Sequence, residues 1–511
     1  MLAKINSFGL RGIDGYAVSV EIDINNGLPG MEIVGLPDAA TKESKERVRS
    51  ALKNSGFRLS PKRITVNLAP ADTRKEGSSF DLPIALGILQ ATEQLPAAGT
   101  EDTIFVGELS LNGGLGRVNG ILPVIIAAAE RGFKRAVIPE GNAEEASFVS
   151  GIAVYALPDL RSVAEFVSGK GEFRPIVTKD PISVAGTRGG GEDLKYVKGQ
   201  YAARRALEIA AAGGHNILMI GPPGGGKTML AKCLPSILPD MSAEEMLETT
   251  KIHSVAGMLP EGEGIISRRP FRSPHHTASR IALTGGGTSA RPGEISLAHN
   301  GVLFLDELPE YPRATLEILR QPIEDGRITV SRAARTVDYP ARFMLVASMN
   351  PCPCGNYGSS SAECTCTPAQ ISKYLSKLSG PLLDRIDIHI EVGSVTYDEL
   401  SSSSDGEDSA TVAARVNAAR RVQLERFAGS GIHCNAQMSG ADVREYCATD
   451  GDSERLLRSA FAKLGLSARA YTRILKVART IADLDGSERV LKKHVAEAVQ
   501  YRSLDRNRGL L

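Results

Sequence analysis

The pattern of apolar and polar residues divides the chain into three blocks. In the first block, up to about residue 168, segments with the alternation of strands are interspersed with segments of helical spacing. The expected strands span residues 16–24, 31–34, 63–67, 136–138 and 153–155, and the expected helices 42–55, 82–89 and 124–131. This mixture predicts an α+β domain.

The second and third blocks differ in their patterns. Residues 169–195 are rich in Gly and Pro without a period, which predicts a linker. A helix at 202–212 and apolar strands at 216–220, 301–305 and 343–349 then predict an α/β unit over 196–400. Beyond a Ser-rich polar break at 401–409 the pattern is helical, with expected helices at 410–427, 441–448, 453–464, 467–484 and 491–501.

Composition narrows the class of protein. A chain of 511 residues has room for about three domains. Its net charge of +1 neither requires nor excludes nucleic acid, and the lack of Trp leaves few platforms for base stacking. No apolar stretch has the length of a signal peptide core or a membrane span, so we expect a cytoplasmic protein without membrane contact. An odd number of cysteines, seven, argues against a secreted disulfide framework.

One glycine-rich segment carries the clearest chemistry. It lies between the apolar strand 216–220 and a helix-compatible segment, the context that a phosphate-binding P-loop requires. Its backbone N–H groups would surround phosphates at a helix N-terminus, Lys227 would reach the β- and γ-phosphates, and Thr228 would ligate Mg²⁺. The alternative, a chance glycine turn, would not need the complete pattern. The loop consists of Gly221, Pro222, Pro223, Gly224, Gly225, Gly226, Lys227 and Thr228.

Two carboxylates follow the apolar strand at 301–305. Asp306 would hold the water shell of Mg²⁺, and Glu307 would polarise the attacking water as general base. Acid pairs also cap helices after strands, but this pair lies in the same α/β unit as the P-loop. Together the two motifs predict hydrolysis of ATP with Mg²⁺.

Four thiols gather in a short segment after Asn350. The two tight C-x-C pairs can close a tetrahedral Zn²⁺ site if the intervening residues fold back. C-x-C is less typical of zinc than C-x-x-C, and four reduced thiols without metal are the alternative. The thiols belong to Cys352, Cys354, Cys364 and Cys366.

Several segments resemble the ComM/YifB-like family of magnesium chelatase-type AAA+ ATPases. The resemblance covers nearly the whole chain and is carried chiefly by residues 30–38, 67–72 and 272–276. It implies a multidomain α/β protein: a Lon-protease-like α+β N-terminal domain (1–168), an AAA+ P-loop α/β core (196–400) with an insert at helix 2, and a helical C-terminal lid (401–511). It also implies a hexameric, ATP-driven motor for branch migration of DNA in homologous recombination and natural transformation.

In the first domain the resemblance extends to the Ser–Lys dyad of Lon proteases. Ser78 or Ser79 lies near the position of the nucleophilic serine. The place of the lysine is taken by Pro123 and Val124. Because a hydroxyl without a neighbouring base is a poor nucleophile, we do not expect protease activity.

The resemblance assigns roles to further residues of the core and lid. Asn350 is similar to the sensor-1 residue that orients water against the γ-phosphate. Arg385 is similar to an arginine finger that acts on the nucleotide of the neighbouring subunit; the alternative is a surface arginine paired to Asp384 or Asp387. In the lid, the segment that begins at 467 is similar to a sensor-2 helix. Its residue for the γ-phosphate of the same subunit is Arg469, with Arg473 as the second choice.

The residues that would contact adenine and DNA are indicated less clearly by the sequence than the P-loop and the acid pair. Tyr196, Val197 and Gln200 precede the first core helix, where related ATPases pack on adenine, although a simple entry loop fits equally. Residues 266–277 and 285–291 resemble the helix-2 insert, which faces the central pore. Residues 326–338 predict a β-hairpin whose tip carries Arg332 and Arg335, either for a DNA backbone in the pore or for solvent.

Two other functions remain possible from the sequence. The ATPase subunit of magnesium chelatase, a protein-remodelling motor, resembles this chain in the type of its core. The resemblance implies that this subunit lacks a Lon-like first domain, so residues 1–168 count against this function. A Lon-type ATP-dependent protease would need the dyad lysine.

Overall fold

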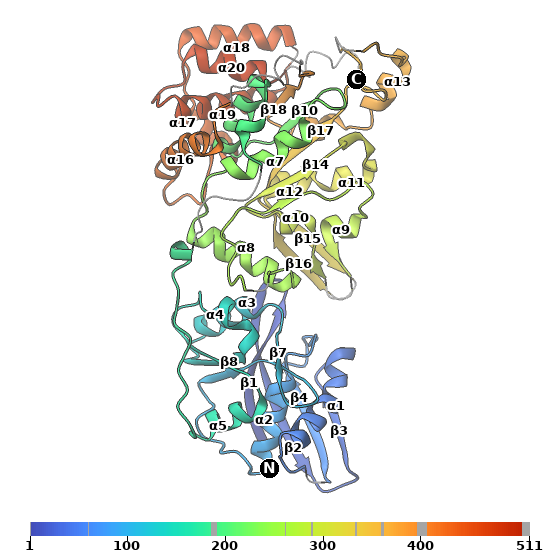
Figure 1. Ribbon diagram of the computed structural model, residues 1–511, viewed down its shortest axis with the longest axis vertical. Coiled ribbons are helices and arrows are strands. Elements are labelled where there is room, and N and C mark those ends of the chain that lie inside the picture. The colour runs from blue at the N-terminus through green and yellow to red at the C-terminus, as the bar shows by residue number, and fades with distance from the viewer. Residues whose placement is uncertain are drawn as a thin grey trace.

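A computed structural model describes residues 2–59, 61–184, 192–260, 262–287, 290–332, 335–358, 362–395, 406–464 and 466–502. The protein is elongated, with the N-terminal domain at one end, the α/β core in the middle and the C-terminal helices at the other end (Figure 1). Within the described ranges, no helix is both long and apolar enough to cross a bilayer.

The N-terminal domain is built on a seven-stranded sheet with the order β3-β4-β2-β1-β5-β8-β9. Apolar residues on the two sheet faces form two clusters: α1, α2 and α5 pack into one, and α3 packs into the other. Every residue of α2 is buried, which makes this helix the centre of the domain. The elements are β1 (Leu2–Arg11), β2 (Asp14–Asn25), β3 (Gly30–Val34), α1 (Ala39–Asn54), β4 (Arg63–Ala69), α2 (Asp81–Ala91), β5 (Thr103–Phe105), β6 (Glu108–Leu109), β7 (Leu115–Gly116), α3 (Ile121–Glu130), β8 (Arg135–Pro139), α4 (Ala143–Ala146), β9 (Ala153–Leu157) and α5 (Leu160–Val167).

The core contains a five-stranded sheet with the order β11-β14-β17-β10-β18, in which all neighbouring strands are parallel. The three central strands β10, β14 and β17 are short apolar runs buried on both faces, as parallel sheets require. The helices are α6 (Tyr201–Gly213), α7 (Lys227–Ile237), α8 (Ala243–Ala256), α9 (Arg280–Thr284), α10 (Glu294–Leu297), α11 (Arg313–Ile318), α12 (Arg320–Asp325), α13 (Pro368–Leu375) and α14 (Gly380–Leu383). The strands are β10 (Ile217–Ile220), β11 (Phe271–Arg272), β12 (Gly285–Gly286), β13 (Arg291–Pro292), β14 (Val302–Leu305), β15 (Arg327–Arg332), β16 (Arg335–Pro340), β17 (Met344–Met349) and β18 (Ile388–Glu391).

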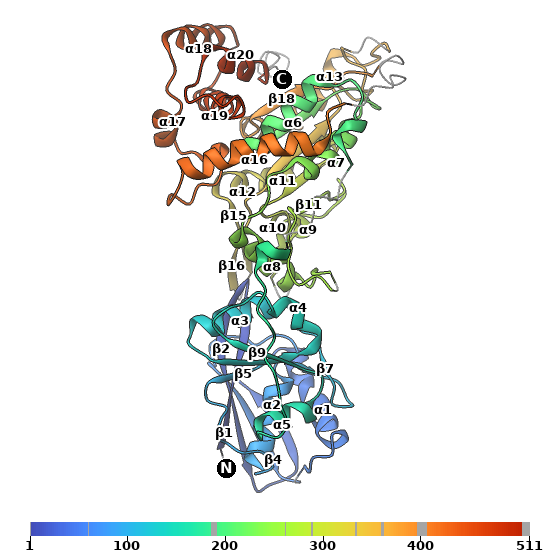
Figure 2. The same ribbon diagram turned by 60° about the vertical axis from the view of Figure 1, so that its left-hand side comes forward.

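The C-terminal domain is helical and shares its apolar core with the α/β unit. Helix α16 lies across α6 and α7, and α19 packs on α6 (Figure 2). Its helices are α16 (Ser409–Arg426), α17 (Gly440–Tyr446), α18 (Gly451–Leu464), α19 (Ala468–Leu484) and α20 (Lys492–Gln500). The helices and strands expected from the sequence recur in all three blocks, with ends shifted by a few residues.

Contacts between α8 of the core and the N-terminal domain join these two parts. The Ser254 hydroxyl donates a hydrogen bond to the buried carboxylate of Glu145, and the Gly120 N–H donates to the Ser254 carbonyl at 3.1 Å. Burial raises the pKa of Glu145. A cavity of about 430 Å³ lies beside this contact, between the turn at Ser78 and the β15–β16 hairpin. The hairpin therefore faces the N-terminal domain.

A buried ion pair stabilises the start of α2. Asp81 is fully buried, and Arg47 donates to both of its carboxylate oxygens, at 2.7 and 3.1 Å. Because Arg47→Leu would leave this carboxylate buried without its cation, we expect the variant to lose about 3 kcal/mol of stability. Circular dichroism during denaturation in urea measures the loss.

A matched control is available on the surface of the same domain. Arg63 pairs with Glu32, and both side chains are 60% exposed. Arg63→Leu should change stability by less than about 0.5 kcal/mol. Equal losses in the two variants would contradict the role assigned to the Arg47–Asp81 pair.

Candidate functional site

The glycine-rich loop joins β10 to α7 at the carboxyl edge of the core sheet. Gly224 and Gly226 have positive φ angles of 76° and 82°, a conformation that favours glycine. A Cβ atom on Gly221 would lie 2.1 Å from the Val392 carbonyl oxygen, so a side chain does not fit there. Helix α7 begins at Lys227, and its first N–H groups therefore point toward the loop. This arrangement suits an anion.

Lys227 is held above the loop by three acceptors. Its ammonium group donates to the carbonyls of Gly221 at 2.7 Å and Pro222 at 2.8 Å, and to Asn350 Oδ1 at 3.1 Å. Asn350 follows β17, the neighbour of β10 in the sheet. Burial lowers the pKa of Lys227. The structure thus brings the predicted lysine and the predicted sensor-1 residue together.

Thr228 and Asp306 lie side by side at the same edge. The Thr228 hydroxyl donates to Asp306 Oδ2 at 2.8 Å, and the Ser348 hydroxyl donates to the other carboxylate oxygen. A hydroxyl beside a carboxylate is the donor set that Mg²⁺ takes in P-loop ATPases, so these residues fit the ion. Ser348 was not predicted from the sequence, because its only signal is its place near the end of the buried strand β17.

Glu307 is positioned by an unusual backbone conformation and a histidine. Its φ angle is 53°, and its N–H donates to Asp306 Oδ1 at 3.0 Å. His276 Nδ1 lies 3.5 Å from Glu307 Oε2, a contact that the sequence analysis did not foresee. Glu307 lines a cavity of about 360 Å³ together with the P-loop, Asp306, Ser348 and Asn350. An acid at this place can act on water beside a bound phosphate.

Of the three residues expected near adenine, one touches the P-loop. Gln200 donates through Nε2 to the carbonyls of Gly393 at 2.6 Å and Gly225 at 3.4 Å. Val197 is buried in the apolar core, and Tyr196 is exposed, with Lys195 above its ring.

Arg385 lies at the opposite edge of the sheet from the P-loop of its own chain. Its backbone carbonyl accepts from the side chain of Asn216, the residue before β10. The guanidinium is buried, pairs with Glu324 at 2.5 Å and donates to the Pro381 carbonyl. Glu324 was not predicted as its partner from the sequence.

The two lid arginines lie near the same edge as Arg385. Arg473 pairs with Asp387, which directly precedes β18, and Arg469 is one turn earlier on α19. This helix is anchored at the amino ends of the strands, where the His215 ring and the Thr480 hydroxyl are 2.8 Å apart. The structure therefore does not bring Arg469 or Arg473 to the P-loop of their own chain, in contrast to the expected sensor-2 role.

A cavity of about 570 Å³ opens at this edge, between the core and the C-terminal helices. Several cations line it, and Glu245, Glu324, Asp325 and Asp387 lie among them. The cations belong to Arg269, Arg342, Arg420, Arg473 and Lys476.

Two other predicted features fall outside the ATP site. The segment 326–338 forms an antiparallel hairpin with Arg332 opposite Arg335, as expected, but the side chains of these two arginines lie outside the described residues. In the N-terminal domain the Ser78 hydroxyl donates to Glu108, and α3 carries Val124.

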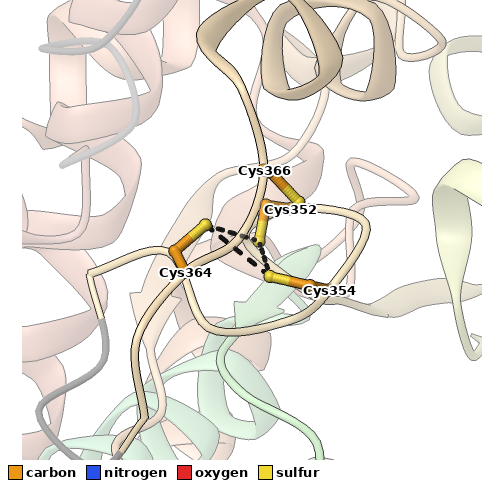
Figure 3. Close-up of side chains that lie close together, drawn as sticks. All are labelled: Cys352, Cys354, Cys364 and Cys366. Carbon is orange, nitrogen blue, oxygen red and sulfur yellow. Dashed lines mark hydrogen bonds between the residues drawn. The ribbon is translucent and has the colours of Figure 1, made fainter.

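The four thiols of the cysteine cluster converge, with all sulfur atoms within 4.8 Å of one another (Figure 3). Cys352 Sγ lies 3.4 Å from Cys354 Sγ and 3.7 Å from Cys364 Sγ, and the latter two are 3.6 Å apart. Zn–S bonds of about 2.3 Å in a tetrahedron place sulfur atoms about 3.8 Å apart. A disulfide would need about 2.05 Å. All four cysteines are free, and their spacing fits a Cys₄ zinc site.

Backbone N–H groups favour the thiolate form of Cys354 in this cluster. The Tyr357 N–H donates to Cys352 Sγ at 3.3 Å. Hydrogen bonds from the backbone of Asn356 and Thr365 lower the pKa of Cys354 to about 5, whereas burial and the neighbouring sulfur atoms raise the pKa of Cys364 and Cys366. Because the thiolate is the form that binds metal, these donors support the fit.

Comparison with known proteins covers almost the whole chain. Family models described as magnesium chelatase, subunit ChlI match residues 193–400, 20–142 and, for the C-terminal part, 406–502. The chain is 46% identical to competence protein ComM of Haemophilus influenzae over 508 residues, which are 99% of this chain and 98% of the relative. It is 45% identical to YifB of Salmonella typhimurium over 509 residues, with the same coverage. The chain belongs to the ComM/YifB family.

This family is of the magnesium chelatase type, and its members are AAA+ ATPases that use ATP and Mg²⁺. A more distant relative, the magnesium-chelatase 38 kDa subunit of Rhodobacter capsulatus, is 25% identical over 173 residues. That match covers 30% of this chain and 49% of the relative.

The positions of Lys227 and Glu307 predict two separable defects. Lys227→Ala removes the cation that meets the phosphates and should abolish ATP binding and hydrolysis. Glu307→Gln keeps the shape of the site but removes the base, so ATP binding should persist while turnover falls at least about 100-fold. Equilibrium nucleotide binding and phosphate release measure the two effects. Near-normal turnover of Glu307→Gln would contradict its assignment as general base.

Proposed function

We propose that this ATPase is a motor that moves branched DNA, as in branch migration during homologous recombination and natural transformation. The observation that carries the proposal is the full-length similarity to a competence protein, combined with a complete P-loop and acid pair. Its proposed site of action is the cytoplasm, where the DNA lies.

The chemistry rests on residues at the carboxyl edge of the sheet. Lys227 binds the β- and γ-phosphates, and Thr228 and Asp306 hold Mg²⁺, which neutralises charge on the phosphates when bound. Glu307 accepts a proton from the attacking water, and Asn350 orients that water toward the γ-phosphate. The Asn350 contact to Lys227 keeps these two residues in a fixed relation.

The active form is proposed to be a ring of six subunits. Arg385 lies near the amino ends of the strands, whereas its own P-loop lies at their carboxyl ends, which supports a role toward the nucleotide of a neighbouring subunit. Arg469 and Arg473 share this edge and are proposed to face the same neighbour. Glu324 would hold Arg385 until a neighbour with bound ATP offers a stronger anion.

DNA contact is proposed for the β15–β16 hairpin. Arg332 and Arg335 stand opposite each other at its tip, and two cations at a tip suit a phosphate backbone. The four-cysteine cluster is proposed to hold one structural Zn²⁺.

A protein-remodelling motor is the second candidate. The family models described as magnesium chelatase, subunit ChlI favour it, but individual magnesium-chelatase subunits match only 30% to 36% of the chain, at 24% to 25% identity. A Lon-type protease is the weakest candidate, because Ser78 pairs with a carboxylate and Val124 stands near the place of the dyad lysine.

The direct test measures the ATPase rate with and without a four-way branched DNA, while strand exchange on that DNA is followed. We expect DNA to stimulate hydrolysis and ATP to drive movement of the branch, with both lost in Lys227→Ala. Hydrolysis that is indifferent to every DNA form would contradict the DNA motor and favour protein remodelling.

The hairpin assignment predicts a salt-dependent defect. Replacing Arg332 and Arg335 by Ala removes two phosphate contacts per hairpin, so the slope of log affinity against log salt should fall in magnitude by about 2 for each hairpin that contacts the DNA. A control variant replaces Arg458 and Arg489, which are exposed on the C-terminal domain, and should keep the slope. An unchanged slope in the hairpin variant would exclude the tip as a DNA contact.

A further inference from the structure

The four-cysteine cluster lies in the loop that joins β17, which ends at the ATP site, to α13. The segment leaves β17 at Asn350, whose side chain accepts from Lys227, and Cys352 follows two residues later. At its far end Cys366 directly precedes Thr367, the N-cap of α13. The cluster therefore fixes the path of the chain between the catalytic amide and the next helix.

The connection also touches the P-loop itself. Gly355, one residue after Cys354, has a φ of 87°, and a Cβ atom there would lie 2.4 Å from Pro223 Cδ. The backbone of the cysteine loop thus packs against a proline of the phosphate-binding loop without room for a methyl group. A shift of this loop must move Pro223 or leave it unsupported.

A third contact links α13 to the same place. Tyr374 is buried, and its hydroxyl faces the backbone of Asn350. The loop that carries these contacts contains no helix or strand in its described residues, 351–358 and 362–367. Within these ranges Cys352 is the one side chain that is buried. An apolar core is not available to fix the loop, so a cross-link must supply its rigidity.

We infer that Zn²⁺ bound by Cys352, Cys354, Cys364 and Cys366 is the cross-link that holds the ATP site in its hydrolytic geometry. The inference extends the zinc assignment and rests on it, but it does not depend on DNA as the substrate. With the metal bound, Gly355 packs against Pro223, and Asn350 keeps its hydrogen bond from Lys227. Without it, the loop loosens, and Asn350 and Pro223 lose their fixed positions.

The effect should be larger on turnover than on nucleotide affinity. The phosphates are bound mainly by the N–H groups at the start of α7 and by Lys227, whose contacts to the Gly221 and Pro222 carbonyls lie outside the cysteine segment. Asn350 acts on the attacking water, where a displacement of about 1 Å costs up to about 100-fold in rate. Loss of zinc should therefore lower kcat at least about tenfold while ATP still binds.

The experiment measures zinc per chain by mass spectrometry in the full-length protein, without DNA, beside ATP binding and turnover. The wild type should contain one zinc per chain. The double variant Cys364→Ser/Cys366→Ser should contain none, bind ATP and turn over at least about tenfold more slowly. Cys447→Ala, which removes a buried thiol of the C-terminal domain, is the matched control and should keep both zinc and turnover.

A second variant separates metal binding from its effect on the ATP site. Gly355→Ala keeps all four thiols but places a methyl group against Pro223, so it should retain zinc and still lose turnover. A wild type without zinc would overturn the metal site. Zinc that can be lost while turnover stays normal, or normal turnover in Gly355→Ala, would overturn the coupling and leave the proposed DNA motor untouched.

Discussion

The ammonium group of Lys227 is the point on which the ATP site depends. It bonds to two carbonyls of its own loop and to Asn350 on the neighbouring strand, so it ties β10 to β17 at their carboxyl ends. These contacts exist because parallel strands end at one edge of the sheet, where loops and helix N-termini gather. Asp306 reaches the same edge from β14 and completes the site through Thr228.

The two edges of the same sheet carry different chemistry. The carboxyl edge offers N–H groups, a lysine and carboxylates to ATP and Mg²⁺. The amino edge carries Arg385, Arg473 and the cavity lined by cations, held in place by Glu324 and Asp387. A single chain cannot bring the two edges together, but the proposed ring would, because each subunit would present its amino edge to the carboxyl edge of the next. This division makes hydrolysis a property of the assembly in the proposed function.

Much of the catalytic site could be predicted because its motifs are local. The P-loop and the acid pair each occupy consecutive residues, and the two C-x-C pairs need only one short connection to meet. The strand β1 (Leu2–Arg11) was not predicted, although it pairs with β2 along its whole length, because its apolar residues do not alternate strictly.

The rest depends on tertiary packing that no short pattern encodes. The spacing of Arg469 and Arg473 predicts that both lie on one face of α19, but it does not say where that face points. The packing of α19 on α6 places them at the amino edge. The contact of His276 with Glu307, the pairing of Arg385 with Glu324 and the hydroxyl of Ser348 each join segments far apart in sequence. The packing of Gly355 against Pro223 likewise joins segments far apart in sequence, and no local pattern indicates it.

The most direct test of the shared site mixes two inactive chains. Lys227→Ala lacks a working P-loop but offers Arg385, and Arg385→Ala lacks the finger but keeps its P-loop. In a random one-to-one mixture, about a quarter of the interfaces combine the intact P-loop with the intact arginine. The account predicts that each variant alone hydrolyses ATP poorly and that the mixture regains turnover. A mixture no more active than the mean of its two components would contradict an ATP site built from two subunits.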